Sequence, residues 1–347
     1  MLLAWLQGRH LAAVCTLAVL ASGAAGCGGD DKEATAIGTP DKIRMATGLG
    51  SFGRESPAWV AKDKGFFAKH GIEIEIQPGA AGSTNLQWLA ANQVQFAIID
   101  YAGAVDRAGK GNFADYKLVG AVNHNTLIAI MAYDDKIKTP KDLEGKTIGQ
   151  AIGAVPKAFF PTYAKLAGVD YGKVKWQETS KDALIPNMAA GKLDAIGQFV
   201  TGVPAVRAAD PKQTLTVLPY SRYVVDLYGN VLVTTGTRAK DNPDLTRRFV
   251  AAYMEGLQYA IDNPAEAATI LGKYVPSQDK AVAQAEVEGL KAYVVNPDGL
   301  GVMTPLRVKK GIELMQGVGQ IPDNALAPED FVDFAVAGTA QFVAGAK

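Results

Sequence analysis

The sequence has little cysteine and little histidine. Its 347 residues include two cysteines, Cys15 and Cys27, and three histidines. Both cysteines lie close to the N-terminus, so the long remainder of the chain has no thiol for a disulfide, a nucleophile or a metal ligand. His70 and His124 are the only histidines in that remainder, and no group of His, Asp and Glu has the spacing of a metal site. We therefore expect neither a metal centre nor cysteine chemistry.

An excess of charge is also missing. Lys and Arg together number 35, as do Asp and Glu, and without a basic excess nothing indicates a nucleic-acid partner. The G-x-S-x-G motif of many hydrolases does not occur. His124 follows a predicted strand, and we expect it to form hydrogen bonds near a site rather than to catalyse a reaction. The sequence therefore predicts no enzymatic activity and no cofactor.

The N-terminus has the pattern of a signal peptide, which we assign to residues 1–26. Arg9 and His10 form a weakly basic start, an apolar run covers residues 11–20, and small residues fill 21–26. This order is typical of secretory signals. The apolar run is too short to span a membrane.

Cys27 follows the small residues directly. Residues 24–27, Ala-Ala-Gly-Cys, resemble a bacterial lipobox, in which the cysteine is acylated after cleavage, although Ala24 stands where leucine is usual. The alternative is an ordinary secretory signal that is cleaved near Ala25. We expect lipidation of Cys27, with residues 27–40 as a flexible tether because they are polar and rich in glycine.

Residues 78–101 hold a loop, a helix and a strand in close succession. A Gly-rich loop precedes a predicted helix, Ser83 to Asn92, and a predicted strand, Val94 to Ile99, which ends at Asp100. Ser83 is a candidate helix cap. In open α/β sheets, ligands lie outside the carboxyl ends of strands and at helix N-termini. The Ser83 end and the Asp100 end should therefore face one crevice.

A similar succession returns later in the chain. Residues 182–199 resemble residues 83–100 in the lengths of helix, turn and strand, although any two α/β units share this likeness. Two such sets favour two α/β lobes. We place lobe 1 at 41–125 and 223–347, and lobe 2 at 126–222. Further apolar or alternating runs predict strands at 43–47, 72–76, 118–122, 128–133, 146–149, 174–178, 215–219 and 230–235, and helices fill most of the C-terminal part.

A family resemblance rests on three sequence segments taken together, residues 56–75, 142–149 and 228–230. Because these segments occur in this order, the chain resembles the solute-binding proteins of the nitrate/sulfonate/taurine group. That group includes binders of thiamine pyrimidine precursors. The resemblance covers about residues 42–276. It implies an α/β fold of the two-lobed periplasmic-binding-protein type (type II), with a ligand cleft between the lobes. It also implies a monomer in the cell envelope that serves the permease and ATPase of an ABC importer.

The resemblance also implies where a ligand is bound. The loops that it indicates contain Ser51, Phe52, Gly82, Ser83, Thr84, Asp100, Tyr101, Asn123 and Gln150. We add four residues that we expect to face the cleft from the later segments, namely Gln198, Tyr220, Asp226 and Tyr228. Many relatives have Ser or Thr where residues 150–154 read Gln-Ala-Ile-Gly-Ala. This loop therefore offers few hydroxyl groups for tight coordination of an inorganic anion.

The charges of these residues predict the character of the ligand. Asp100 and Asp226 would place two carboxylates in the cleft, with Arg54 as the nearby cation, and carboxylates in a low-dielectric cleft repel a bare anion. The aromatic residues suit a flat organic body. We therefore expect a small organic solute with a donor group, such as a heteroaromatic amine or an amino-sulfonate. The alternatives are an inorganic anion such as nitrate or bicarbonate, and a cleft in which Asp226 is paired with Arg222 or Arg54 and the aromatic residues form core.

Residues Gly48, Gly50 and Gly53 formally match the G-x-G-x-x-G fingerprint of dinucleotide-binding proteins, and Glu73 or Glu75 follows at about the expected distance. An NAD-binding oxidoreductase is therefore an alternative from another functional class. Against it, the acidic residues lie inside the predicted second strand, whereas a ribose contact requires an acidic residue at the strand end.

Overall fold

The computed structural model describes residues 39–112, 115–133, 135 and 137–339. The predicted signal peptide, Cys27 and most of the predicted tether lie outside these residues. Within the described part, no helix has both the length and the apolar character that a membrane crossing requires.

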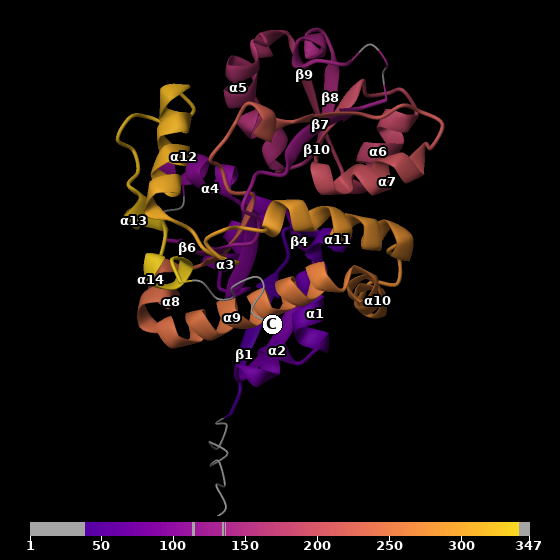
Figure 1. Cartoon of the computed structure of the whole chain (residues 1–347). Coiled ribbons are helices and arrows are strands. Elements are labelled where there is room, and N and C mark those ends of the chain that lie inside the picture. The colour runs from indigo at the N-terminus through magenta and orange to yellow at the C-terminus, as the bar shows by residue number, and fades with distance from the viewer. Residues whose placement is uncertain (1–38, 113–114, 134, 136, 340–347) are drawn as a thin grey trace, which may run out of the picture. The chain divides into compact units, whose positions relative to one another are not determined.

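Two five-stranded sheets organise these residues (Figure 1). The strands of the first sheet lie in the order β3 (Ile72–Gln77), β1 (Asp41–Ala46), β5 (Phe96–Asp100), β12 (Asn230–Thr234) and β6 (Lys117–Ala121). Those of the second sheet lie in the order β11 (Thr216–Pro219), β7 (Ile128–Ala132), β10 (Ala195–Phe199), β8 (Thr147–Ala151) and β9 (Lys175–Thr179). A small ribbon pairs β2 (Leu49–Gly50) with β4 (Gly79–Ala80).

We call the first sheet with its helices lobe 1 and the second sheet with its helices lobe 2. Lobe 2 carries α5 (Val155–Ala167), α6 (Lys181–Ala189) and α7 (Val203–Ala209). Lobe 1 carries α1 (Ser56–Asp63), α2 (Phe66–Lys69), α3 (Gly82–Ala90), α4 (Tyr101–Gly109), α8 (Gly236–Asp241), α9 (Pro243–Asp262), α10 (Pro264–Tyr274), α11 (Lys280–Val294), α12 (Pro305–Gly317), α13 (Pro328–Phe331) and α14 (Phe334–Ala337). Short 3-10 turns are η1 (Gly53–Glu55), η2 (Pro140–Leu143), η3 (Tyr171–Lys173), η4 (Val200–Gly202) and η5 (Tyr220–Arg222).

The edge strand β3 follows directly from its sequence. Ile72, Ile74 and Ile76 are buried, whereas Glu73 and Glu75 between them are exposed. Side chains of a strand alternate between its two faces, so the isoleucines pack on the core and the charges meet water. β3 lies at the edge of the sheet as its alternation predicts, and charged residues on an edge oppose pairing with other chains.

The chain passes between the two sheets twice, through residues 122–127 and 220–229. After the second passage β12 returns to lobe 1 and pairs antiparallel to β5, with Asn230 opposite Asp100. β5 is buried over its whole length, as expected for a central strand that is covered on both faces. The two passages therefore bring residues from distant parts of the sequence to the carboxyl end of β5.

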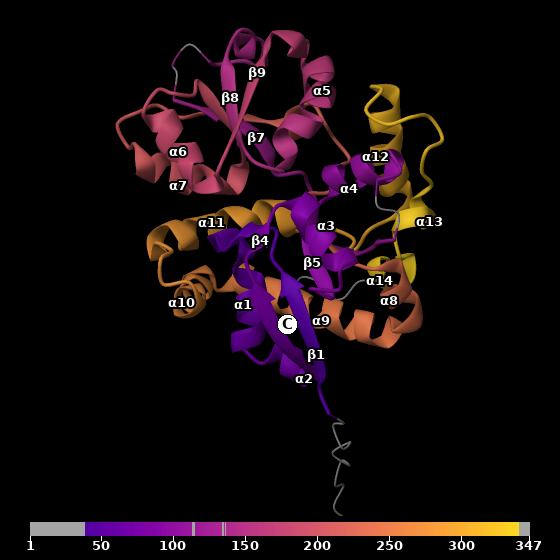
Figure 2. The same ribbon diagram turned by 180° about the vertical axis from the view of Figure 1, so that it is seen from behind.

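Helix α11 lies between the lobes, where it packs on η1 of lobe 1 and on η4 and α7 of lobe 2 (Figure 2). This packing explains why residue 53 is a glycine. A Cβ at Gly53 would lie 2.3 Å from the carbonyl oxygen of Ala283 in α11, and the Gly53 N–H donates to Glu286 Oε2 at 2.7 Å. In a dinucleotide site, the backbone N–H groups of this turn would face a pyrophosphate. The last glycine of the fingerprint is thus accounted for by helix packing.

We predict that Gly53→Ala lowers the free energy of unfolding by about 2 kcal/mol, because the new methyl group must displace the backbone of α11. Gly289→Ala is the matched control, since a Cβ at this exposed position of α11 meets no atom within 4 Å. This control should be neutral or stabilising by about 0.5–1 kcal/mol. Urea unfolding of both variants measures the difference, and equal stabilities would contradict the packing argument.

Candidate functional site

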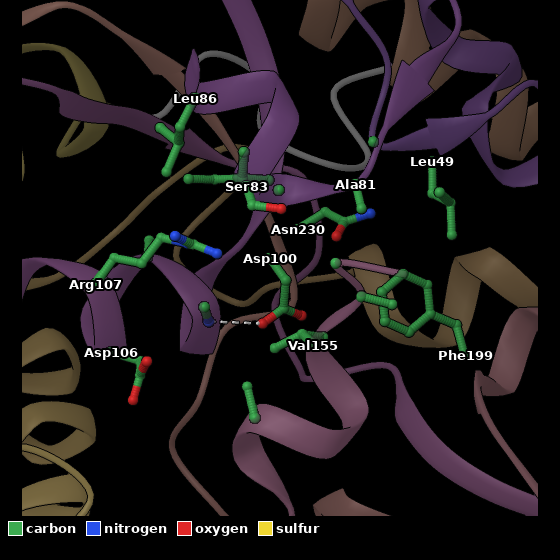
Figure 3. Close-up of a pocket in the computed structure, with 18 residues that line it drawn as sticks. Leu49, Ala81, Ser83, Leu86, Asp100, Asp106, Arg107, Val155, Phe199 and Asn230 are labelled. Carbon is green, nitrogen blue, oxygen red and sulfur yellow. Dashed lines mark hydrogen bonds between the residues drawn. The ribbon is translucent and has the colours of Figure 1, made fainter. Parts of the chain in front are cut away.

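A cavity of about 80 Å³ lies where the two lobes meet (Figure 3). It opens at the carboxyl end of β5, as expected for an α/β sheet. Its lobe 1 wall includes Leu49, Ala81, Gly82, Ser83, Leu86, Ile99, Asp100, Arg107 and Asn230. Its lobe 2 wall includes Gly153, Ala154, Val155, Ala158 and Phe199.

The lobes touch each other beside this cavity. A Cβ at Gly153 of lobe 2 would lie only 2.7 Å from Ser83 Oγ of lobe 1. Gly103 of α4 faces Val155 of α5 in the same way, because a Cβ there would lie 3.5 Å from Val155 Cγ2. Gly153 has a φ of +73°, which a glycine adopts without strain. The glycine at each contact thus permits the close approach of the two lobes.

Asp100 places a buried carboxyl group in the cavity wall. It caps α4, since its Oδ1 accepts a hydrogen bond from the Gly103 N–H at 3.2 Å. Its Oδ2 is buried and has no hydrogen-bond partner among the described residues. Burial raises the pKa of Asp100 to about 7, although the N–H groups of Gly103 and Ala102 lower it. A buried acceptor without a partner is costly, so Asp100 is suited to receive a donor from a ligand.

Arg107 is a cation in the same wall, and its side chain points into the cavity (Figure 3). No hydrogen bond or ion pair joins its guanidinium to another residue of the described part of the chain. The neighbouring Asp106 also lines the cavity, and its Oδ1 accepts from Lys110 Nζ and from Gln320 Nε2, both at 2.6 Å. Arg107 lies one turn beyond Gly103 on α4, a helix spacing by which sequence analysis could have found it.

Of the residues expected to bind ligand, Gly82, Ser83 and Asp100 line this cavity. Ser83 is not the helix cap that we predicted. The capping position is Ala81, whose φ is 82°, and no side chain caps α3. Because the helix begins one residue before Ser83, the hydroxyl group of Ser83 lies in the first turn, at the cavity wall.

Asn85 holds this wall together, although the sequence did not single it out. It is fully buried, and its Nδ2 donates to the carbonyl oxygens of Thr47, Gly48 and Ile98 at 2.7, 3.0 and 2.9 Å. Its Oδ1 accepts from the Ala80 N–H at 3.0 Å. One amide thus ties the ends of β1, β4 and β5 to α3.

Phe52 and Gln198 line a second and smaller cavity next to the first. Gln150 lines neither cavity: its Oε1 accepts from the Lys157 N–H at 2.8 Å and its Nε2 donates to Glu178 at 3.1 Å. It therefore fixes the start of α5. Ser51 and Thr84 also lie outside the linings of both cavities.

Three tyrosines that we expected in the cleft are core residues. Tyr101 donates to the carbonyl oxygen of Val308 at 3.2 Å, and Tyr220 donates to that of Pro156 at 3.1 Å. Tyr228 packs edge-on against Tyr101, with ring centroids 5.5 Å apart. All three are at most 1% exposed and none lines the cavity. Burial of a ring together with a partner for its hydroxyl group is the stable arrangement, which places these side chains in the core instead of the cavity wall.

Asn123 and Asp226 belong to the two passages between the lobes. Asn123 Oδ1 accepts from the Asn230 N–H at 3.2 Å, within the interior. Asp226 lies 3.7 Å from Lys310 Nζ in an ion pair and faces a groove beside Arg307. Asp226 is therefore not the second carboxylate of the cleft, and its partner is neither Arg222 nor Arg54.

Phe199 is the aromatic residue that does line the cavity. It ends β10, as Asp100 ends β5. In the two similar stretches of sequence, residues 83–100 and 182–199, these two residues occupy the same last position. The likeness of the two stretches is therefore the sequence signal that indicates Phe199.

Gln320 joins the lobes at the edge of the site, where α12 lies beside α4 and reaches α5 (Figure 1, Figure 2). Besides Asp106, its Nε2 donates to the carbonyl oxygen of Ala158 at 3.0 Å, and its Oε1 accepts from Thr162 at 3.4 Å. Both of these partners lie on α5 of lobe 2. The side chain thus connects the cavity wall of lobe 1 to lobe 2.

We predict that Gln320→Ala favours separated lobes and weakens ligand binding about three- to tenfold, because two hydrogen bonds between the lobes are lost. Spin labels at Glu73→Cys and Lys192→Cys, in a full chain with Cys15→Ser and Cys27→Ser, report the distance between the lobes. Gln316→Ala is the control, since Gln316 donates only to the Pro322 carbonyl of the same segment. The same distance distribution in both variants would contradict this role.

The fold is that of periplasmic binding proteins, with two α/β lobes and a cleft between them. The structure resembles the alkanesulfonate-binding protein SsuA from Xanthomonas axonopodis pv. citri, bound to MOPS, with a TM-score of 0.68 and 17% sequence identity, over 85% of this chain and 99% of that chain. It also resembles the periplasmic nitrate-binding protein NrtA from Synechocystis, with a TM-score of 0.69 and 13% identity, over 86% and 87% of the two chains.

The chain belongs to the family described as NMT1/THI5 like, which matches residues 55–267. Among curated proteins, it is 23% identical to the formylaminopyrimidine-binding protein of Halalkalibacterium halodurans over 253 residues, 70% of this chain and 74% of the relative. The resemblance predicted from the three sequence segments is therefore confirmed.

Proposed function

We propose that the protein is an extracytoplasmic solute-binding protein that delivers a small organic solute to the permease and ATPase of an ABC importer. Its membership of the family and the binding proteins named among its relatives support this role. We propose further that it binds its ligand without converting it, that it acts as a monomer in the cell envelope, and that lipid on Cys27 anchors it there.

The observation that carries the proposal is that Asp100 and Arg107 line the same largely apolar cavity. A water molecule needs about 10–15 Å³ of such space, so 80 Å³ holds roughly five to eight water-sized groups. Asp100 can accept from a donor, Arg107 can bind an electron-rich group, and Phe199 offers a flat apolar surface. An amino-sulfonate of the taurine type or an aminopyrimidine meets all three conditions.

An inorganic anion such as nitrate is the second candidate, and Arg107 is the observation in its favour. Arg107 also changes the expected charge of the cavity, because a guanidinium group lines it together with the carboxyl groups of Asp100 and Asp106. Nitrate would nevertheless leave Asp100 without a donor and the apolar wall without a partner. The organic solute therefore satisfies more of the groups in the wall.

A thermal-shift screen of the purified chain against nitrate, taurine, alkanesulfonates, aminopyrimidines and aromatic acids tests the proposal. A ligand at a hundred times its Kd stabilises the folded form by about 2.7 kcal/mol. We expect such a shift with an organic solute, and a smaller shift for the Arg107→Gln or Asp100→Asn variant. A shift with nitrate alone would favour the anion binder, and no shift with any of these compounds would contradict the proposed ligand class.

A further inference from the structure

A second compartment adjoins the cavity that holds Asp100. Its volume is about 30 Å³, and it shares Leu49, Ala154 and Phe199 with the first compartment. Phe52, Arg54 and Gln198 line only the second one. The two compartments share three wall residues. A ligand in the first compartment can therefore extend past Phe199 into the second.

Arg54 is the polar group that dominates this compartment. Its side chain is only 3% exposed, and it lies between two rings, with the guanidinium carbon 4.5 Å from the centroid of Phe52 and 5.3 Å from that of Phe199. An arginine has five N–H donors. Here a single hydrogen bond, to the Leu49 carbonyl oxygen at 3.4 Å, uses one of them among the described residues, and Nε has no hydrogen-bond partner. Buried donors without acceptors are costly.

Two carboxyl groups lie near Arg54, and each has another partner for only one of its oxygens. Glu55 Oε1 lies 3.5 Å from Arg54 Nε, but Glu55 Oε2 accepts from the Gly48 N–H at 3.0 Å. Glu286 Oε2 accepts from the Gly53 N–H. Burial raises the pKa of both glutamates, with Arg54 acting against it. Burial thus favours the protonated form of both carboxyl groups, which lowers their repulsion of an oxyanion in the compartment.

We propose that the solute has two parts, a donor-bearing body beside Asp100 and an oxyanion arm, such as a carboxylate, that passes Phe199 and receives hydrogen bonds from Arg54. This inference rests on the proposed function and specifies the chemical class of the solute. About 30 Å³ holds roughly two or three water-sized groups, which is the size of a carboxylate. Arginine binds planar oxyanions through two parallel N–H groups. Lys181 also lines this compartment, and its Nζ is paired with Asp182 Oδ1 at 2.9 Å.

The test uses two probes that differ only in the arm, 4-amino-2-methylpyrimidine and 4-amino-2-methylpyrimidine-5-carboxylate. Calorimetric titration of the full chain gives the ratio of the two dissociation constants, which isolates the contribution of the arm. We expect the arm to strengthen binding about tenfold or more in the wild type. Arg54→Gln should reduce this ratio to about one, while the neutral probe still binds and so shows that the variant is folded.

Arg107→Gln is the matched control, because Arg107 lines only the first compartment. It should weaken the binding of both probes and leave their ratio unchanged. If Arg54→Gln fails to fold, Arg54→Lys, which keeps the charge but loses the planar pair of donors, should lower the ratio at least threefold. A ratio of one in the wild type, or a ratio that responds to Arg107 and not to Arg54, overturns the inference and leaves the proposed function intact. A chain that binds neither these probes nor any organic solute of the screen overturns both.

Discussion

Replacing Asp100 by asparagine will stabilise the ligand-free protein above pH 7 and weaken its binding of amine-bearing solutes. Asparagine keeps the cap of α4, because its side-chain oxygen can still accept from the Gly103 N–H. It removes a carboxyl group whose pKa burial raises to about 7. The variant therefore loses the cost of a buried charge and the charged acceptor for a ligand at the same time.

The pH dependence follows from the direction of the pKa shift. In the unfolded chain Asp100 ionises near its ordinary value of 3.8, and in the folded chain near 7. The protonated carboxyl contributes stability below the unfolded value, and that stability is lost as the pH rises through 7. Between pH 4 and pH 8, the free energy of unfolding of Asp100→Asn should thus rise by up to about 4 kcal/mol relative to that of the wild type. Urea unfolding at several pH values measures the gain.

Asp279→Asn is the matched control for Asp100→Asn. Asp279 caps α11 in the same manner, with its Oδ1 2.8 Å from the Val282 N–H, but it is exposed to water. The free energy of unfolding of Asp279→Asn should therefore show no such rise with pH relative to the wild type. In titration calorimetry, Asp100→Asn should bind an amine-bearing solute about ten- to hundredfold more weakly, as expected when a hydrogen bond to a charged group is lost. Parallel stability curves for wild type and Asp100→Asn would contradict the buried-charge argument.

The fold could be predicted from local patterns. The alternation at residues 72–77 defines an edge strand, the apolar run before Asp100 defines a central strand, and Pro156 near the start of a periodic segment marks α5. Each of these signals depends only on neighbours in sequence, because strand and helix periods place side chains on one face. The carboxyl end of β5 as a site follows from the same reasoning, and it placed Asp100 at the cavity wall.

Other parts of the site depend on contacts between distant residues. Asp226 is paired with Lys310 on α12, and the Gly53 N–H is bound by Glu286 on α11. The direction of a tyrosine ring also depends on packing, as for Tyr220, whose ring stacks on that of Tyr163 with centroids 4.2 Å apart. No residue spacing encodes these pairings. Residue type alone therefore assigned to the cleft three tyrosines and one aspartate, Asp226, that packing places elsewhere.

Replacing Cys27 by serine should abolish membrane association. We proposed that lipid on Cys27 anchors the protein. Acyl chains hold a protein at a membrane because each buried CH₂ contributes about 0.8 kcal/mol. If Cys27 carries the lipid, Cys27→Ser must release the protein or leave its signal peptide uncleaved.

Fractionation of cells that express the wild type, Cys27→Ser or Cys15→Ser, followed by intact-mass measurement, tests this prediction. Cys15 lies within the apolar part of the predicted signal peptide, so Cys15→Ser should behave like the wild type, which is expected in the membrane pellet with a mass increased by acylation. A soluble wild type that begins just after Ala25 would instead establish the ordinary secretory signal. A processed and membrane-bound Cys27→Ser protein would show that another group forms the anchor, because serine cannot provide the thioether on which lipobox acylation depends.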